Sequence, residues 1–185
     1  MYKEQGEEIT KTEAGLMLSA ILSDTLMFRS PTCTPVDKAA AEELAKIANV
    51  DIETHAKNMF RAGRDFASKT TEEIFYQDFK HFTVGDVKFG VGQINSMNSD
   101  ELRELKERLE PFFKEVANTH RLDMVFFMLT NIIEESTELL CYGKGAKEQV
   151  IEAFDLPAET EDVRLAGVVS RKKQLIPAFV VSFQQ

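Results

Sequence analysis

The chain has 185 residues, of which 43% are hydrophobic and 29% are charged, and its formal net charge at pH 7 is -9. This composition is ordinary for a folded globular protein, and the acidic charge argues against nonspecific binding to nucleic acid or to anionic membranes. Polar and acidic residues open the chain, and the longest apolar run, around Met124–Ile133, is too short to span a bilayer. The two cysteines follow no metal-ligand spacing, so we expect a soluble cytoplasmic protein with reduced thiols.

Capping patterns and apolar periodicity predict three helices in the first third of the chain, over residues 14–28, 35–48 and 52–63. Apolar residues occupy most of the surface of the first helix, so neighbouring elements should cover it on nearly all sides. Asp24 falls inside this helix, where an ionised carboxylate would be costly unless it were paired or bound to a metal. Two interpretations stay open: a structural one, in which Asp24 caps a neighbouring helix or pairs with Arg29, and a functional one, which burial favours.

A short polar connection, Arg64–Lys69, is the predicted boundary between two domains. Thr70 and Glu73 form a capping box for a brief helix. The elements predicted after it are strands over 80–84 and 87–94 joined by a Gly85-Asp86 hairpin, a helix over 99–118 kinked at Pro111, strands over 124–129 and 138–142, a helix over 146–154, and a strand-like closing segment that holds residues 170–174. This order predicts an α/β domain in which helices cover a mixed β-sheet.

The closing segment contains Ser170-Arg171-Lys172-Lys173-Gln174 between two apolar runs. An arginine beside a lysine offers a planar fork and a compact point charge, a combination suited to phosphate oxygens. A solvated turn, or an edge strand that uses lysines against aggregation, explains the cluster equally well. Lys80 is similarly ambiguous, because a strand lysine between aromatic residues is usually an edge residue that extends to water.

No spacing in the chain forms a complete active site. There is no Gly-rich phosphate loop of a known type and no Gly-x-Ser-x-Gly elbow. None of His55, His81 and His120 has a His, Asp or Glu two or four residues further on, as metal-binding helices and turns do, so each is expected to be a structural residue.

Two stretches nevertheless resemble the signatures of a known family. Residues 14–34 read AGLMLSAILSDTLMFRSPTCT, and residues 167–174 read GVVSRKKQ. Both resemble motifs of the manganese-dependent (family II) inorganic pyrophosphatases of the DHH phosphoesterase superfamily, and their order and separation also fit. The resemblance covers essentially the whole chain and implies a two-domain enzyme with its active site in the cleft between the domains.

The resemblance assigns roles to four side chains. Asp24 corresponds to a ligand of a cluster of Mn²⁺ or Co²⁺ ions, with Mg²⁺ accompanying the substrate. Arg171 and Lys172 correspond to the pair that binds pyrophosphate, and Lys80 corresponds to a further phosphate-binding lysine. No catalytic residue is assigned to this chain.

The resemblance also implies a domain organisation. Residues 1–63 would be the helical tail of the metal-binding N-terminal domain, residues 64–69 the linker, and residues 70–185 the C-terminal domain that closes over the substrate. The Asp-His-His motif and the other metal ligands of the family have no counterpart, so we expect the chain to be the C-terminal part of such an enzyme. Because Asp24 alone cannot hold a pair of divalent ions, we expect the isolated chain to be inactive and to bind metal only when the missing ligands are supplied.

The expected reaction of the complete enzyme is hydrolysis of pyrophosphate to two phosphates by water that bridging metal ions activate, while cations neutralise charge on the phosphates. Two alternatives stay open: an exopolyphosphatase-like phosphoesterase, and a non-catalytic module that binds phosphate-containing ligands or docks on a partner. Helices whose apolar surfaces lack a partner often associate with one another, so a homo-oligomer is also expected.

Overall fold

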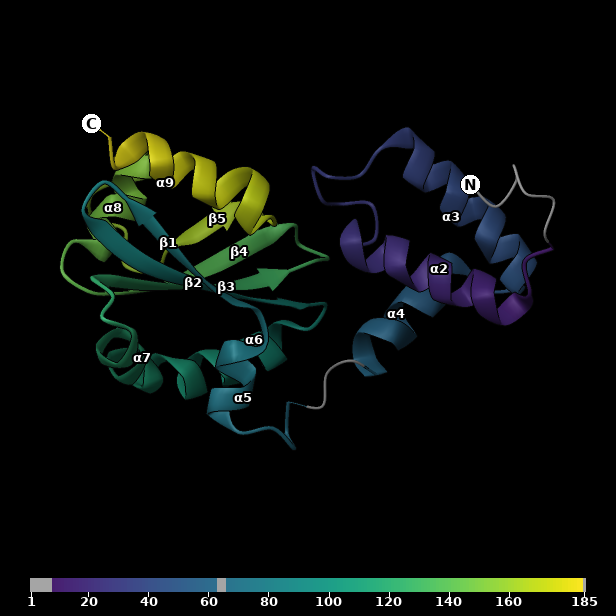
Figure 1. The fold of residues 1–185 in the computed structure, drawn as a ribbon, viewed down its shortest axis with the longest axis horizontal. Helices are drawn as coiled ribbons and strands as arrows, with labels where there is room; N and C mark the ends of the chain where they lie inside the picture. Colours follow the sequence, from purple (N-terminus) through teal and green to yellow (C-terminus); the bar gives the residue numbers. More distant parts are fainter. Residues whose placement is uncertain (1–7, 63–65, 185) are drawn as a thin grey trace. The chain divides into compact units, whose positions relative to one another are not determined.

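The computed structural model describes residues 8–62 and 66–184 of the chain (Figure 1). By its internal contacts the chain divides into two compact units, Met1–Asp65 and Phe66–Gln185. The predicted linker over 64–69 falls partly outside the described residues, and Phe66 is buried in the core of the second unit. Within the described ranges, no helix is long and apolar enough to cross a membrane.

Residues 8–62 of the first unit form the predicted helices α2 (Lys11–Asp24), α3 (Pro35–Ala48) and α4 (Ile52–Ala62). The end predicted for the third helix at Gly63 lies outside the described residues. Small and aliphatic side chains make up the core of this unit: Ala14, Leu18, Leu22, Ala41, Leu44, Ala45 and Ala56. Alanines at so many of these positions let the helices pack closely.

The first helix begins and ends earlier than predicted. It ends at Asp24, and Leu26, Met27 and Phe28 follow with φ angles of 47°, 54° and 68°. Non-glycine residues rarely adopt this left-handed region in succession, because their Cβ atoms crowd the backbone. Leu26 is still only 6% exposed, so the apolar pattern continues past the end of the helix and the periodicity does not locate that end.

The second unit is built on a five-stranded sheet with the order β1-β2-β3-β4-β5. The strands are β1 (Phe79–Val84), β2 (Val87–Ser96), β3 (Met124–Asn131), β4 (Ser136–Tyr142) and β5 (Arg164–Ala166). The β2–β3 pair is parallel and the other three pairs are antiparallel, so the predicted mixed sheet is confirmed.

Helices cover both faces of this sheet (Figure 1). One face is covered by α5 (Thr71–Phe75), α6 (Ser99–Leu109) and α7 (Phe113–His120), and the other by α8 (Ala146–Ala153) and α9 (Ile176–Ser182). The parallel strands require a crossover connection, which α6 and α7 provide. The predicted interruption at Pro111 is confirmed as a 3₁₀ turn between these two helices.

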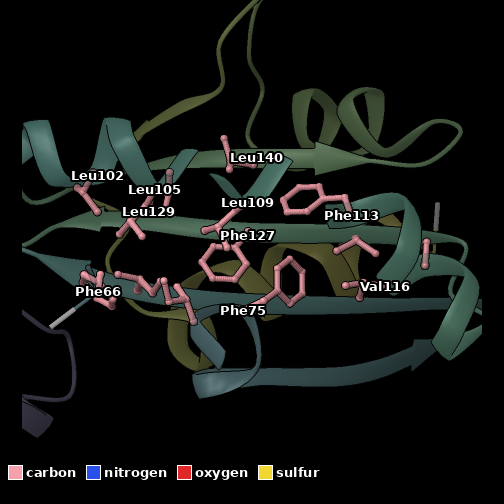
Figure 2. Packing of buried hydrophobic residues seen from close by; sticks show 14 residues of the cluster. Phe66, Phe75, Leu102, Leu105, Leu109, Phe113, Val116, Phe127, Leu129 and Leu140 are labelled. Atoms are coloured by element: carbon pink, nitrogen blue, oxygen red, sulfur yellow. The ribbon is translucent and has the colours of Figure 1, made fainter. Parts of the chain in front are cut away.

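Alternate side chains of β3 enter two separate cores, as the pleat of a strand requires. The core beneath α5, α6 and α7 takes Val125, Phe127 and Leu129, whereas the core beneath α8 and α9 takes Phe126 and Met128. Figure 2 shows the first of these cores, in which phenylalanine rings from strand and helices pack against one another. The continuous apolar run in the sequence therefore belongs to a strand that is covered on both faces, as predicted.

The closing segment is helical, so the predicted strand around the basic cluster is wrong. β5 has only three residues, and Arg171–Leu175 forms a π-helical turn that continues into α9. Leu175 and Phe179 are fully buried about one helical turn apart, and such an apolar run fits a buried helix as well as a buried strand. Pro177 lies in the first turn of α9, where its missing N–H costs nothing, whereas in a central strand it would remove a ladder hydrogen bond.

Candidate functional site

The loop before the basic cluster is closed by the side chain of Gln174. Its Oε1 accepts hydrogen bonds from the backbone N–H groups of Val169 (2.9 Å) and Ser170 (3.0 Å), and its Nε2 donates to the carbonyl of Gly167 (2.6 Å). Gly167 has a φ of 74°, which glycine adopts without strain. The glycine and the glutamine of the GVVSRKKQ motif therefore shape this loop.

The same loop is tied to the sheet. Gln93 on β2 donates from Nε2 to the carbonyl of Val169 (3.0 Å), and the Thr137 hydroxyl on β4 donates to the carbonyl of Val168 (2.6 Å). Ser170 caps the helical segment that follows, because its Oγ accepts from the backbone N–H of Lys173 (3.3 Å). The backbone at the start of the basic cluster is thus fixed relative to β2 and β4.

Arg171 is buried, with a relative exposure of 7%. Its Nη1 donates to the carbonyl of Asp78 (2.8 Å) and to the carbonyl of Val91 (2.9 Å), and its Nη2 donates to Asp78 Oδ1 (2.6 Å). The guanidinium therefore joins the start of the closing helical segment to the residue before β1 and to the middle of β2. Its charge is paired with a carboxylate, which removes much of the cost of burying it.

Lys80 occupies the strand position opposite a residue that this guanidinium contacts. On β1 it is opposite Val91, whose carbonyl accepts from Arg171, and directly opposed residues of paired strands project to the same face of a sheet. Val91 belongs to the core beneath α8 and α9, so Lys80 lies on the face that carries the basic cluster. Lys80 and Lys172 are exposed, and in the described part of the chain neither forms an ion pair. Three of the four residues predicted for the site, Lys80, Arg171 and Lys172, therefore lie on the same side of the sheet.

Asp78 is the residue that the sequence analysis missed. It directly precedes β1 and pairs with Arg171 across 93 positions of the chain, a separation that no local pattern records. The sequence gives one indication of its role: an acidic residue stands two positions before Lys80, one of the predicted phosphate-binding cations.

The burial predicted for Asp24 is wrong. Asp24 is the last residue of α2 in the first unit and is exposed, because the helix ends there and the chain turns away through the left-handed residues that follow. Its backbone carbonyl accepts a hydrogen bond from Thr32 Oγ1 (3.3 Å). The described residues contain no group of three or more His, Cys, Asp or Glu side chains that could hold a metal ion. The side chains present therefore do not fit a metal centre by themselves.

Two of the three histidines lie together, although no sequence spacing relates them. The rings of His81 on β1 and His120 at the end of α7 have centroids 4.7 Å apart, and the Tyr76 hydroxyl lies 2.9 Å from His120 Nε2. Burial lowers the pKa of His81, and the neighbouring His120 lowers it further. The third, His55, contacts Ser19 Oγ at 2.8 Å in the helical unit. Phe79 and Tyr76 pack against His120, which is consistent with the structural role predicted for this residue.

Comparisons with known proteins show the family to which this chain is related. The family model described as the DHHA2 domain matches residues 57–180. A manganese-dependent inorganic pyrophosphatase of Bacillus subtilis (strain 168) is 44% identical over 177 residues, which cover 96% of this chain and 57% of the relative. A Bacillus cereus (strain 03BB102) protein, provisionally given the same description, is 42% identical over 184 residues, which cover 100% of this chain and 59% of that protein.

A solved structure extends the likeness to the fold. The crystal structure of a Methanococcus jannaschii protein, provisionally assigned as a family II inorganic pyrophosphatase, matches 97% of this chain with a TM-score of 0.82 and 36% sequence identity, and the match covers 58% of that protein. The chain thus spans less than three-fifths of the length of the relatives it matches. The matched DHHA2 residues make up most of the chain and include Lys80, Arg171 and Lys172, and the chain belongs to the DHHA2 domain family.

Proposed function

We propose that this chain is the substrate-binding part of a manganese-dependent inorganic pyrophosphatase, an enzyme that hydrolyses pyrophosphate to two phosphates. The observation that supports the proposal is the position of Lys80, Arg171 and Lys172 on the same side of the sheet of a DHHA2 domain, in an otherwise acidic chain. The descriptions of the B. subtilis and M. jannaschii relatives support the same substrate.

The hydrogen bonds of Arg171 leave room for an anion. An arginine has five N–H donors, and Arg171 uses three of them on Asp78 and Val91. Asp78 accepts from both terminal nitrogens, so its oxygens lie at the end of the guanidinium. The Nε–H and the remaining Nη2–H then point outward along one long edge of the guanidinium. These two donors have no partner among the described residues.

Such a pair of parallel N–H groups matches two oxygens of one phosphate. Unpaired donors on a group with 7% exposure are costly, and a bound phosphate would remove that cost. The ammonium groups of Lys80 and Lys172 would neutralise further phosphate oxygens, including those on which charge grows as the phosphoanhydride bond breaks. In this proposal the chain binds and orients pyrophosphate and stabilises its negative charge.

Manganese, or cobalt in its place, would have to be held largely by residues outside those described here, since they contain no cluster of metal-binding side chains. We propose that the exposed carboxylate of Asp24 contributes one ligand in the complete protein. Residues 1–63 would then be the tail of a metal-binding domain, with residues 64–69 as the linker and residues 70–185 as the domain that closes over the substrate.

We also propose that the protein is cytoplasmic, with neither nucleic acid nor membrane as a partner, in keeping with its net charge of -9. A homo-oligomer is proposed for a different reason. Leu16 and Val36 in the helical unit have relative exposures of 67% and 75%, and a second copy of the chain would cover such apolar side chains.

The test is titration calorimetry of the 185-residue chain with pyrophosphate. Lys172→Ala should weaken binding at least about tenfold, because a charge-assisted contact to a phosphate oxygen is lost. Lys114→Ala is the matched control, since this exposed lysine lies on α7, across the sheet from the basic cluster, and its loss should change the affinity less than about twofold. Equal losses in the two variants would remove Lys172 from the site.

A second assay tests whether hydrolysis requires metal ligands from outside this chain. With manganese supplied, the chain alone should hydrolyse pyrophosphate at a negligible rate, and robust turnover would contradict the need for further metal ligands. Tighter binding of long polyphosphates than of pyrophosphate would instead favour an exopolyphosphatase-like enzyme. Binding with no turnover even in the complete protein would leave the non-catalytic phosphate-binding module.

A further inference from the structure

We propose that Asp78 is a positioning residue for the phosphate-binding cations, an inference that rests on the function proposed above. Asp78 gives two acceptors to one guanidinium, its backbone carbonyl (2.8 Å) and its Oδ1 (2.6 Å). A planar group held at two points by one residue cannot rotate about its long axis without losing a hydrogen bond. The direction in which Arg171 presents its Nε–H and free Nη2–H is therefore set by Asp78.

The burial of the two partners supports this role. The Arg171 side chain has a relative exposure of 8%, whereas that of Asp78 is 47%. The arginine is enclosed by protein, and the aspartate stands at the edge of the solvent and holds the arginine from that side. Without the carboxylate, a buried guanidinium would keep only its two carbonyl partners and part of its charge would be uncompensated.

The same contact also locates Lys80. Asp78 directly precedes β1, and Lys80 follows it by two residues in a strand whose position is set by pairing with β2. Arg171 donates to Asp78 and to the carbonyl of Val91, the residue that pairs with Lys80, so one guanidinium contacts both the start of β1 and the residue opposite the lysine. Loss of Asp78 should loosen the relation between Arg171 and Lys80.

If only charge mattered, removing Asp78 would change pyrophosphate binding in the direction opposite to that expected from a positioning role. A carboxylate beside three cations repels an approaching anion, so its removal should strengthen pyrophosphate binding if charge alone matters. If Asp78 positions Arg171, its removal should weaken binding although the site becomes more positive. The sign of the change therefore separates the two cases.

The experiment compares Asp78→Ala and Asp78→Asn in the 185-residue chain by calorimetry with pyrophosphate. Asp78→Ala should weaken binding about tenfold, the usual effect of losing a hydrogen bond to a charged group. Asp78→Asn keeps an oxygen acceptor at the same place and should restore the affinity to within about threefold of the unmodified chain. The charge-matched control is Asp155→Asn at an exposed residue with a φ of 50°, a conformation that asparagine tolerates.

A double-mutant cycle with Arg171→Lys guards against a general loss of folding. Lysine lacks the fork, so Asp78→Ala in that background should change the affinity less than about twofold. A full tenfold loss in the Arg171→Lys background would overturn the inference, because Asp78 would then act through something other than Arg171. Unchanged or tighter binding by Asp78→Ala would also overturn it.

Binding by the unmodified chain separates failure of the proposed function from failure of the positioning role. If the unmodified chain binds pyrophosphate and Lys172→Ala loses binding while Asp78→Ala does not, the positioning role fails alone. If the unmodified chain does not bind pyrophosphate at all, the proposed function fails and the positioning role fails with it.

Discussion

Phe75 packs among several aromatic rings in the core beneath α5, α6 and α7 (Figure 2). It is fully buried, and five aromatic rings lie with centroids between 5.0 and 5.5 Å from its own. These rings belong to Tyr76, Phe79, Phe112, Phe113 and Phe127. They come from β1, β3, α7 and the 3₁₀ turns that follow α5 and α6, so one ring joins most of the elements of this layer.

Phe75→Ala should therefore be among the most damaging substitutions in this unit. Truncation of a buried phenylalanine to alanine costs about 3–5 kcal/mol, and because this ring packs against aromatic neighbours on several sides, we expect a value of about 4 kcal/mol. Phe75→Leu keeps most of the volume and should cost about 1 kcal/mol. Because Phe75 precedes Asp78 by three residues, the truncation to alanine should also loosen the start of β1.

Hydrogen–deuterium exchange measured by peptide is the suitable assay, since the chain has no tryptophan and consists of two compact units. Amides of β3 should exchange roughly a thousandfold faster in Phe75→Ala, the factor that corresponds to about 4 kcal/mol. Amides of α2, in the other unit, serve as the internal reference. Phe112→Ala removes a ring that is only partly buried and should cost about 1–2 kcal/mol.

Two results would refute this reasoning. Unchanged exchange of β3 in Phe75→Ala would mean that the core closes around the deletion. An equal acceleration in α2 and β3 would mean that the two units unfold together, so that the effect could not be assigned to the core beneath α5, α6 and α7.

Further predictions concern acid stability and backbone crowding. Burial and the nearby His120 lower the pKa of His81 below 6.5, so the folded state binds fewer protons than the unfolded state. The free energy of unfolding should therefore be highest above about pH 6.5 and fall as the pH drops below that value. His81→Gln should reduce the difference between the urea midpoints at about pH 7.5 and about pH 5.5. Gly143 has a φ of 115°, and an added Cβ would lie 2.3 Å from the backbone oxygen of Asp123, so Gly143→Ala should cost about 3 kcal/mol or more in urea unfolding. Gly15→Ala, at a helical position with open space around it, should instead stabilise its unit by up to about 1 kcal/mol, and a loss of stability there would contradict the open geometry.

Features that depend on neighbours in the chain were predictable. Thr70 with Glu73 forms the predicted capping box, because such a box consists of hydrogen bonds between residues three positions apart, and Thr10 with Glu13 forms another of the same kind. The Gly85-Asp86 turn joins β1 and β2 as predicted, with Gly85 at a φ of 58°. The mixed sheet was also predictable from the order of strands and helices. The apolar pattern of each element reflects which of its faces are covered, so the elements themselves could be identified.

Burial was less predictable. The apolar composition around Asp24 indicated a covered carboxylate, but the helix ends at this residue and its side chain is exposed. The cations at 171–173 suggested exposure, yet Arg171 is buried while Lys172 is exposed. Composition records how much apolar surface a segment has, whereas the burial of one side chain depends on the direction in which the backbone turns.

By itself, the sequence determined where most helices and strands lie, which residues cap them, and which cations are candidates for binding phosphate. These properties arise from residues that are close together in the chain. Only the tertiary structure decided that the closing segment is helical, that Lys80 pairs with a residue that Arg171 contacts, and that Asp78 binds this arginine. Arg171 reaches Asp78 and Val91 over 93 and 80 positions of the chain. Contacts at such separations depend on the packing of the whole domain, and no local pattern of residues encodes them.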